Sequence, residues 1–163
     1  MQLRPLFSLL GSPVRDRSRP VLLAIGAGAT LVGATAPSTS DVTVVAVNLR
    51  NDHGVVRACL TGQHDDFPSC KDPADSINLV RDAAGTVTMT FRDVAPGRYA
   101  IALLHDENDN GKADRAAMMI PTEGFGFSRD AKVRFGPPKF REAAFDVAAG
   151  EDERLVIRMR YLL

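Results

Sequence analysis

Hydrophobic and polar residues alternate along most of the chain after residue 41, and this alternation is the feature that most limits its fold. In Thr86–Phe91, for example, Val87, Met89 and Phe91 fall on one face. Successive side chains of a β-strand point to opposite faces, so a period of two predicts strands with one buried face. Turn-forming residues, such as those at 50–54, separate the alternating segments. No segment has convincing helical spacing, so we predict an all-β chain.

Several segments have this strand character. They are 42–49, 55–60, 77–81, 86–91, 98–104, 143–147 and 154–162. We expect the first two to form a hairpin, and we expect the most apolar one, 98–104, to lie centrally. About seven short strands in a chain of this length predict a two-sheet antiparallel sandwich of the immunoglobulin-like kind. A small β-barrel is the alternative.

The first 36 residues have the pattern of a cleaved export signal. Three arginines at 15–19 precede an apolar segment rich in small residues at 21–34, and small residues suited to signal peptidase follow. This apolar segment is shorter than the roughly 20 residues of a membrane-spanning helix, which disfavours an uncleaved anchor. We predict a signal peptide at 1–36, a linker at 37–40 and a single domain at 41–163, in a periplasmic or secreted protein with no membrane span after cleavage.

Charge argues against one class of partner. The whole chain has 20 basic and 20 acidic residues, but residues 37–163 retain sixteen and nineteen, a net charge of −3. With no basic stripe, no nucleic-acid partner is expected. The partner class that remains is a cell-envelope or extracellular one of unknown identity.

The chain has two cysteines, Cys59 and Cys70. In an exported domain two cysteines normally form a disulfide. A metal pair or a redox pair fits less well, because there is no C-x-x-C and no second pair of cysteines to complete a zinc site. We predict a Cys59–Cys70 disulfide.

A long connection, from His105 to about Arg141, begins with a possible calcium loop. Oxygen-bearing side chains alternate at Asp106, Asn108 and Asn110, and Gly111 follows. This spacing matches positions 1, 3, 5 and 6 of an EF-hand loop, where the inward-pointing side chains surround a hard cation. Asp114 falls at position 9, and a main-chain carbonyl near Lys112 would supply a further ligand.

Two features weaken the calcium hypothesis: position 12 lacks its usual ligand, and no flanking helices are apparent. Position 12 is Ala117 where a bidentate Glu is expected, so the affinity would be low unless Glu123 or Asp130 contributed a ligand. The alternative is a turn held by Asx hydrogen bonds, which uses the same residue types without a metal. Calcium is therefore a possible cofactor, and no other cofactor is expected.

The rest of the long connection is rich in aromatic residues. Half of the eight phenylalanines lie there: Phe125, Phe127, Phe135 and Phe140. We expect them to fold the connection back onto the sandwich as a small second core. The alternative is an apolar surface for a ligand or partner.

Catalytic patterns are largely missing. Ser128 is not in a G-x-S-x-G turn, and the histidines show no metalloprotease spacing. An enzyme that uses His105 with the acidic loop, including Asp106 and Glu123, is the least favoured hypothesis. The chain is therefore not expected to be an enzyme.

Four motifs carry a family resemblance: the segment Phe91–Ala100, LLHDENDNGKAD, IPTEGFGFS and FGPPKFREAAFDV. In order and spacing they resemble a bacterial family catalogued only as a domain of unknown function, number 2141, over about residues 41–162. The resemblance implies an exported bacterial protein, commonly Gram-negative, and the family is similar in pattern to transthyretin-like and carboxypeptidase-regulatory-like sandwiches. It implies no activity and no catalytic residues. We therefore predict a non-catalytic binding or structural module, with a weak calcium-binding module as the alternative.

Overall fold

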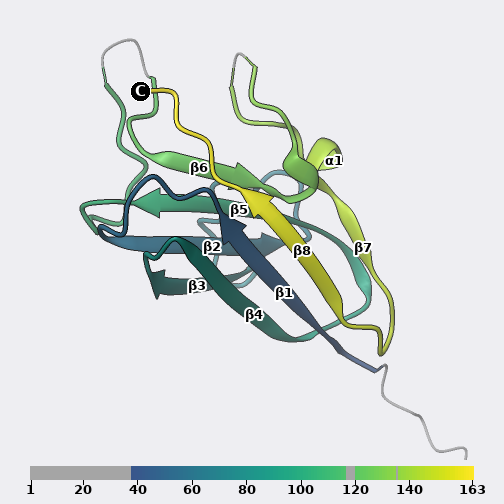
Figure 1. Ribbon diagram of the computed structural model, residues 1–163. Helices are drawn as coiled ribbons and strands as arrows, with labels where there is room; N and C mark the ends of the chain where they lie inside the picture. Colours follow the sequence, from purple (N-terminus) through teal and green to yellow (C-terminus); the bar gives the residue numbers. More distant parts are fainter. Residues whose placement is uncertain (1–37, 117–119, 135) are drawn as a thin grey trace, which may run out of the picture. The chain divides into compact units, whose positions relative to one another are not determined.

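The computed structural model describes residues 38–116, 120–134 and 136–163 (Figure 1). The predicted signal peptide and Phe135 lie outside these residues. The strands are β1 (Ser40–Val47), β2 (Val55–Thr61), β3 (Ser76–Asp82), β4 (Thr86–Val94), β5 (Gly97–Asp106), β6 (Gly124–Phe127), β7 (Phe145–Val147) and β8 (Glu153–Arg158). A 3-10 turn (Ser128–Asp130) and a short helix, α1 (Phe140–Ala143), lie between β6 and β7. The prediction of a nearly all-β chain is confirmed.

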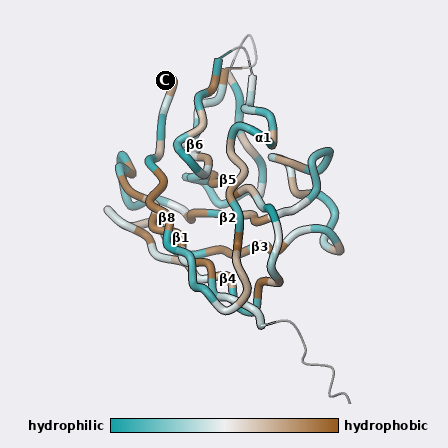
Figure 2. Tube along the Cα trace, turned by 90° about the vertical axis from the view of Figure 1, so that its right-hand side faces the viewer, coloured by the Kyte–Doolittle hydropathy of each residue, from teal (hydrophilic) through white to brown (hydrophobic). Residues whose placement is uncertain are grey.

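The strands form two sheets. One sheet has the order β4-β1-β8, and the other has the order β3-β2-β5-β6, with β7 also paired to β5. Their facing sides enclose a core in which Phe91, Ile101 and Ile157 are fully buried. Figure 2 shows the hydrophobic segments running along the strands and the hydrophilic ones gathering in the loops. The two-sheet sandwich is therefore confirmed, and the central position of β5 agrees with the expectation from its apolar sequence.

Three details of the predicted arrangement are wrong. β1 and β2 do not form a hairpin, because β1 pairs with β4 and β8 while β2 pairs with β3 and β5 in the other sheet. The sandwich is not wholly antiparallel, because β1 and β8 run parallel from Val42↔Glu153 to Val47↔Arg158. The alternative of a small barrel also fails, since β3 and β4 end different sheets and do not pair. Alternation shows that a segment is a strand, but it does not show which partner that strand takes.

The long connection contains a strand that the sequence analysis missed. β6 pairs with β5 from Ala102↔Phe127 to His105↔Gly124, and all four of its residues are buried. With both faces covered, β6 has no polar alternation to reveal it. Its glycines permit close packing: a Cβ at Gly126 would lie 2.8 Å from Cγ2 of Ile157.

Phenylalanines on β6 and α1 form the expected second core. Phe125, Phe127 and Phe140 pack with Phe67 and several alanines. Ser128 is fully buried beside them. Its hydroxyl accepts the N–H of Ile101 at 2.9 Å and donates to the main-chain oxygen of Ala143 at 2.6 Å. One hydroxyl therefore joins β5 to the end of α1.

Candidate functional site

The acidic loop after β5 is anchored by Asp106, which is fully buried. Its carboxylate accepts main-chain N–H groups of Asn110 at 3.0 Å and Gly111 at 2.8 Å. Nε of Arg57, on β2, donates to it at 2.6 Å, and the same guanidinium reaches Asp109. Burial alone would raise the pKa of Asp106, but the hydrogen bonds from Arg57, Gly111 and Asn110 hold that pKa below its ordinary value.

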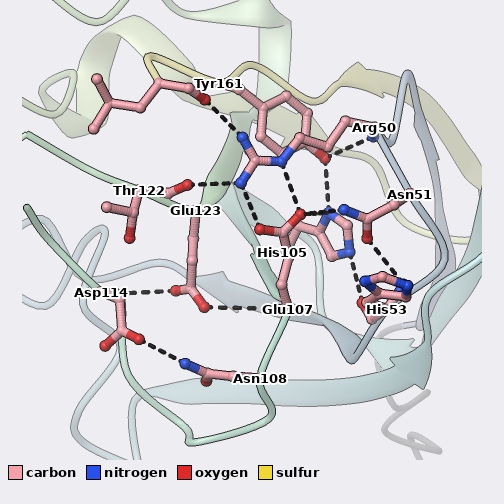
Figure 3. A network of polar contacts seen from close by, with 11 residues as sticks. Arg50, Asn51, His53, His105, Glu107, Asn108, Asp114, Thr122, Glu123 and Tyr161 are labelled. Carbon is pink, nitrogen blue, oxygen red and sulfur yellow. Dashed lines mark hydrogen bonds and ion pairs between the residues drawn. The ribbon is translucent and has the colours of Figure 1, made fainter.

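Asp114 receives the side chains at the other predicted ligand positions. The amide nitrogen of Asn108 donates to Oδ2 of Asp114 at 2.7 Å (Figure 3), and the amide nitrogen of Asn110 donates to the same oxygen at 2.9 Å. The oxygens of the same amides accept main-chain N–H groups of Asn110 and Lys112. These contacts form the network of Asx hydrogen bonds that a turn without metal would use.

Glu123, immediately before β6, ties the two ends of the acidic loop together. It is 4% exposed, and its two carboxylate oxygens accept the main-chain N–H groups of Glu107 and Asp114 at 3.2 and 3.0 Å. Burial raises its pKa, and the negative charges of Asp106 and Asp114 add to that effect.

Arg50 is the centre of a second network next to this loop (Figure 3). Its guanidinium donates to both carboxylate oxygens of Glu107, to the main-chain oxygens of Thr122 and Leu163, and lies 4.6 Å from the centre of the Tyr161 ring. The hydrogen bond from Arg50 is the main reason that the pKa of Glu107 falls to about 2. This network joins the loop after β1 to the loop after β5 and to the end of the chain.

His105 is fully buried on β5 and both of its ring nitrogens are engaged. Nδ1 lies 2.7 Å from the Tyr161 hydroxyl, and Nε2 lies 2.9 Å from the main-chain oxygen of His53. The carbonyl can only accept, so Nε2 carries a proton, and in the neutral ring the Tyr161 hydroxyl donates to Nδ1. His105 therefore has a structural role that fills its hydrogen-bonding capacity.

The structure places the predicted site residues in three groups. Cys59 and Cys70 form the predicted disulfide. Asp106, Asn108, Asn110, Lys112 and Asp114 share the acidic loop, but among the described residues no three His, Cys, Asp or Glu side chains are grouped to hold a metal ion. The calcium site therefore stays a prediction. Phe125, Phe127 and Phe140 are buried in the second core.

Sequence reasoning missed Arg50, Arg57 and Tyr161, which hold the loop in place. Arg57 and Asp106 are 49 positions apart, and Arg50 and Glu107 are 57 apart. No local spacing indicates such pairs. The register of β2 against β5, in which Val55 opposes Asp106, is what brings Arg57 near the loop.

Comparison with known proteins places this architecture in a family. A family described as "Uncharacterized protein conserved in bacteria (DUF2141)" matches residues 44–154, which include the second half of β1, all of β2 to β7 and the acidic loop. The chain belongs to this family. The match to the family confirms the resemblance seen in the motifs. No curated protein and no solved structure matches the chain.

Within the part of the chain that the structure describes, no helix has the length and apolar character needed to cross a membrane.

Proposed function

We propose that this chain is an exported, non-catalytic binding module that adds an extended segment of a partner protein to the free edge of β3. β3 pairs with β2 alone, so its other edge has no partner strand among the described residues. An unpaired edge offers N–H and C=O groups that only another extended main chain can match along their length.

The register shows which residues of β3 face outward. Beyond β3 the ladder continues with a hydrogen bond from Ala83 N–H to the Gly54 oxygen at 3.0 Å. In an antiparallel ladder, every second residue of a strand exchanges main-chain hydrogen bonds with the same neighbouring strand. Counting back from Ala83 in steps of two, the main-chain groups of Ile77, Leu79 and Arg81 bond to β2. The main-chain groups of Asn78 and Val80 then point outward, and the Val80 oxygen accepts the guanidinium of Arg81 at 2.9 Å.

Side chains distinguish β3 from the edges of β4 and β6. The edge strand β8 also carries an exposed apolar side chain, Val156 at 61%, but the main-chain N–H of Arg158 there donates to Asp130 Oδ1 at 3.3 Å. Ile77 and Val80 on β3 are 40% and 42% exposed, whereas the fully exposed positions of β4 are Thr, Arg and Asp. The outer edge of β6 is occupied, because Phe125 and Arg160 exchange hydrogen bonds of 3.0 and 2.8 Å. Of the edges of β3, β4 and β6, that of β3 is the one that combines free main-chain groups with apolar side chains.

Two further observations support the other parts of this proposal. His105 and Ser128, the nucleophile or base candidates nearest the acidic loop and β6, both spend their polar atoms on internal hydrogen bonds. That use favours a non-catalytic role. The Cys59–Cys70 disulfide is typical of an oxidising compartment and supports export.

A proline at position 78 tests the proposed edge. Residues 37–163 would be used to select binders from a displayed library of ten-residue peptides. Asn78→Pro removes an outward N–H and the exposed side-chain amide that donates to Ser76 Oγ, so folding should be retained while binding of the selected peptides falls at least tenfold. Asn78→Ala keeps the N–H and should bind as the parent does. Failure to select any peptide, or equal binding to the proline variant, would overturn the proposal.

Calcium binding by the acidic loop is a second candidate. The favouring observation is that Asn108 and Asn110 converge on one oxygen of Asp114, which makes no ion pair among the described residues. A cation at that point would replace the two amide N–H donors if the amides rotated to present oxygen. Against it, the Arg57 guanidinium already forms ion pairs with Asp106 and Asp109 and offsets part of their negative charge.

Thermal unfolding tests the calcium candidate. At 5 mM calcium a site with a Kd of ~10⁻⁴ M would add about 2.3 kcal/mol of stability, a shift of several degrees. Asp114→Asn should abolish this shift, whereas Asp109→Asn, on a non-ligand position of the same loop, should preserve it. If neither calcium nor a chelator changes the unfolding temperature, the loop is a hydrogen-bonded turn.

A further inference from the structure

The segment that follows β8 forms an open cleft where it passes between the two sheets. The cleft has a volume of about 630 Å³. Three cationic side chains line it: Lys132, Arg158 and Arg160. Phe125, from β6, and Leu162 supply apolar surface beside them.

Hydrogen bonds between distant segments build the walls of this cleft. The guanidinium of Arg160 donates to the main-chain oxygens of Asp130 and Ala131, both at 3.1 Å, which holds the segment carrying Lys132. On the other side, the amide of Asn48 donates to the Met159 oxygen at 2.9 Å. These bonds fix the main-chain segments that carry the three cations, and they also fix the Arg160 guanidinium.

The charge of this cleft differs from that of the whole domain. Residues 37–163 carry a net charge of −3, yet none of the described residues that line the cleft is acidic. The carboxylate of Asp130 lies 3.6 Å from Arg160 and partly neutralises that one cation. The side chains of Lys132 and Arg158 make no hydrogen bond or ion pair with other described residues, so their charges are available to a ligand.

We propose that this cleft binds a phosphate group carried on an apolar ring or chain. A guanidinium donates parallel N–H bonds that match phosphate oxygens, and a lysine adds a compact charge beside it. The exposed side chain of Leu162 (54%) then receives most of the apolar part of the ligand, because Phe125 lines the cleft but is only 9% exposed. The ligand is either a soluble aryl or alkyl phosphate or the head group of an anionic lipid. This site uses residues that the proposed binding edge at β3 does not.

Phenyl phosphate is the probe for the soluble class. It would be titrated into residues 37–163 and followed by the amide NMR signals of the cleft. We expect shifts at Phe125, Lys132 and residues 158–162, with weaker binding of inorganic phosphate because it lacks the ring. Lys132→Ala and Arg158→Ala should each weaken binding at least tenfold, with unchanged thermal unfolding because both side chains are exposed.

Arg154→Ala is the matched control. Arg154 is exposed on the same strand and the same face as Arg158, four residues away and outside the cleft. Arg154→Ala removes one positive charge, as Lys132→Ala and Arg158→Ala do. Because Arg154 lies outside the cleft, this variant should bind phenyl phosphate within twofold of the parent. An equal loss in Arg154→Ala would show that general charge attraction is responsible, and this result would overturn the proposal.

Vesicles distinguish the lipid source. Co-sedimentation with vesicles of phosphatidylcholine containing phosphatidic acid, compared with phosphatidylcholine alone, measures head-group binding. Binding that Lys132→Ala and Arg158→Ala abolish supports the proposal with a lipid as the source, even if phenyl phosphate binds weakly. If neither phenyl phosphate nor these vesicles bind, or if binding is indifferent to both variants, the cleft is not a phosphate site.

Discussion

At the scale of single residues, two neighbouring glutamates have opposite electrostatic roles. Glu107 accepts hydrogen bonds from the Arg50 guanidinium and from Asn51, and its pKa falls to about 2. Glu123 is buried beside other carboxylates and receives only main-chain N–H groups, so burial raises its pKa. A paired carboxylate stabilises the folded state in its charged form, whereas burial without a cation opposes that form.

Because the pKa of Glu107 is low, the free energy of unfolding should depend on pH in the acid range. An ordinary glutamate has a pKa of 4.5, so the contribution of Glu107 is fully present above that pH and is lost as the pH falls toward 2. We expect Glu107→Gln to be less stable than the parent at pH 7 by about 2–3 kcal/mol, with the gap closing near pH 2. Urea denaturation across this range measures the difference. Asp146→Asn, which breaks the exposed pair with Arg98, is the control and should change stability little. A gap that persists at pH 2 would contradict the assignment.

At the scale of elements, β6 shows how a buried strand escapes pattern analysis. Its sequence, Gly-Phe-Gly-Phe, is typical of a loop, yet β5 lies on one side of it and Arg160 on the other. Glycine is needed at Gly124 because a side chain there would overlap the ring of Tyr161. The two glycines therefore allow the segment after β8 to cross β6 closely, and this crossing also forms one wall of the cationic cleft.

Replacing Gly124 should disturb this crossing. Gly124→Ala forces the Tyr161 ring away and should cost about 1–3 kcal/mol, the usual range for an overpacked site. Gly85→Ala is the matched control, because a Cβ there would meet nothing within 4 Å. Equilibrium denaturation of both variants compares the costs. If the two variants are equally stable, the close approach of β6 and Tyr161 is not required by the fold.

At the scale of the whole molecule, the sandwich is joined along one side and left open along the other. Strand β8 belongs to the sheet β4-β1-β8. The segment after β8 pairs with β6 of the other sheet through Arg160 and Phe125. Tyr161 then reaches His105 inside the second sheet. The open side is bounded by β3 and β4, and the proposed strand-adding edge lies there.

The Tyr161 hydroxyl is a measurable part of this closure. Tyr161→Phe leaves Nδ1 of the buried His105 without its donor and the main-chain N–H of Arg50 without its acceptor, and it should cost about 1–3 kcal/mol. Tyr99→Phe is the natural control, since these are the two tyrosines of the chain and the Tyr99 hydroxyl makes no hydrogen bond to another described residue. Urea denaturation at neutral pH measures the free energy of unfolding of both variants. Equal loss in both variants would mean that the hydrogen bonds of the Tyr161 hydroxyl add no specific stability.

Local chemistry accounts for what the sequence alone could predict. The alternation of Val87, Met89 and Phe91 follows from the two-residue repeat of a strand, and all three are buried as expected. The disulfide and the second phenylalanine core also follow from residue type, because the two cysteines are expected to pair if the domain is exported and large apolar rings are usually buried. Asp106, Asn110 and Gly111 form a tight turn because their side chains and backbone preferences act within a few residues.

Contacts between distant residues decided the rest. Whether β1 pairs with β2 or with β8 depends on which sheet covers the apolar face, and no local signal contains that choice. The same holds for Arg57 at Asp106, for Arg50 at Glu107, and for the cations of the cleft, because each group joins segments that are close only in the folded chain. Strand identity is thus determined by short-range periodicity, whereas sheet partners, buried polar networks and binding surfaces depend on packing across the whole domain.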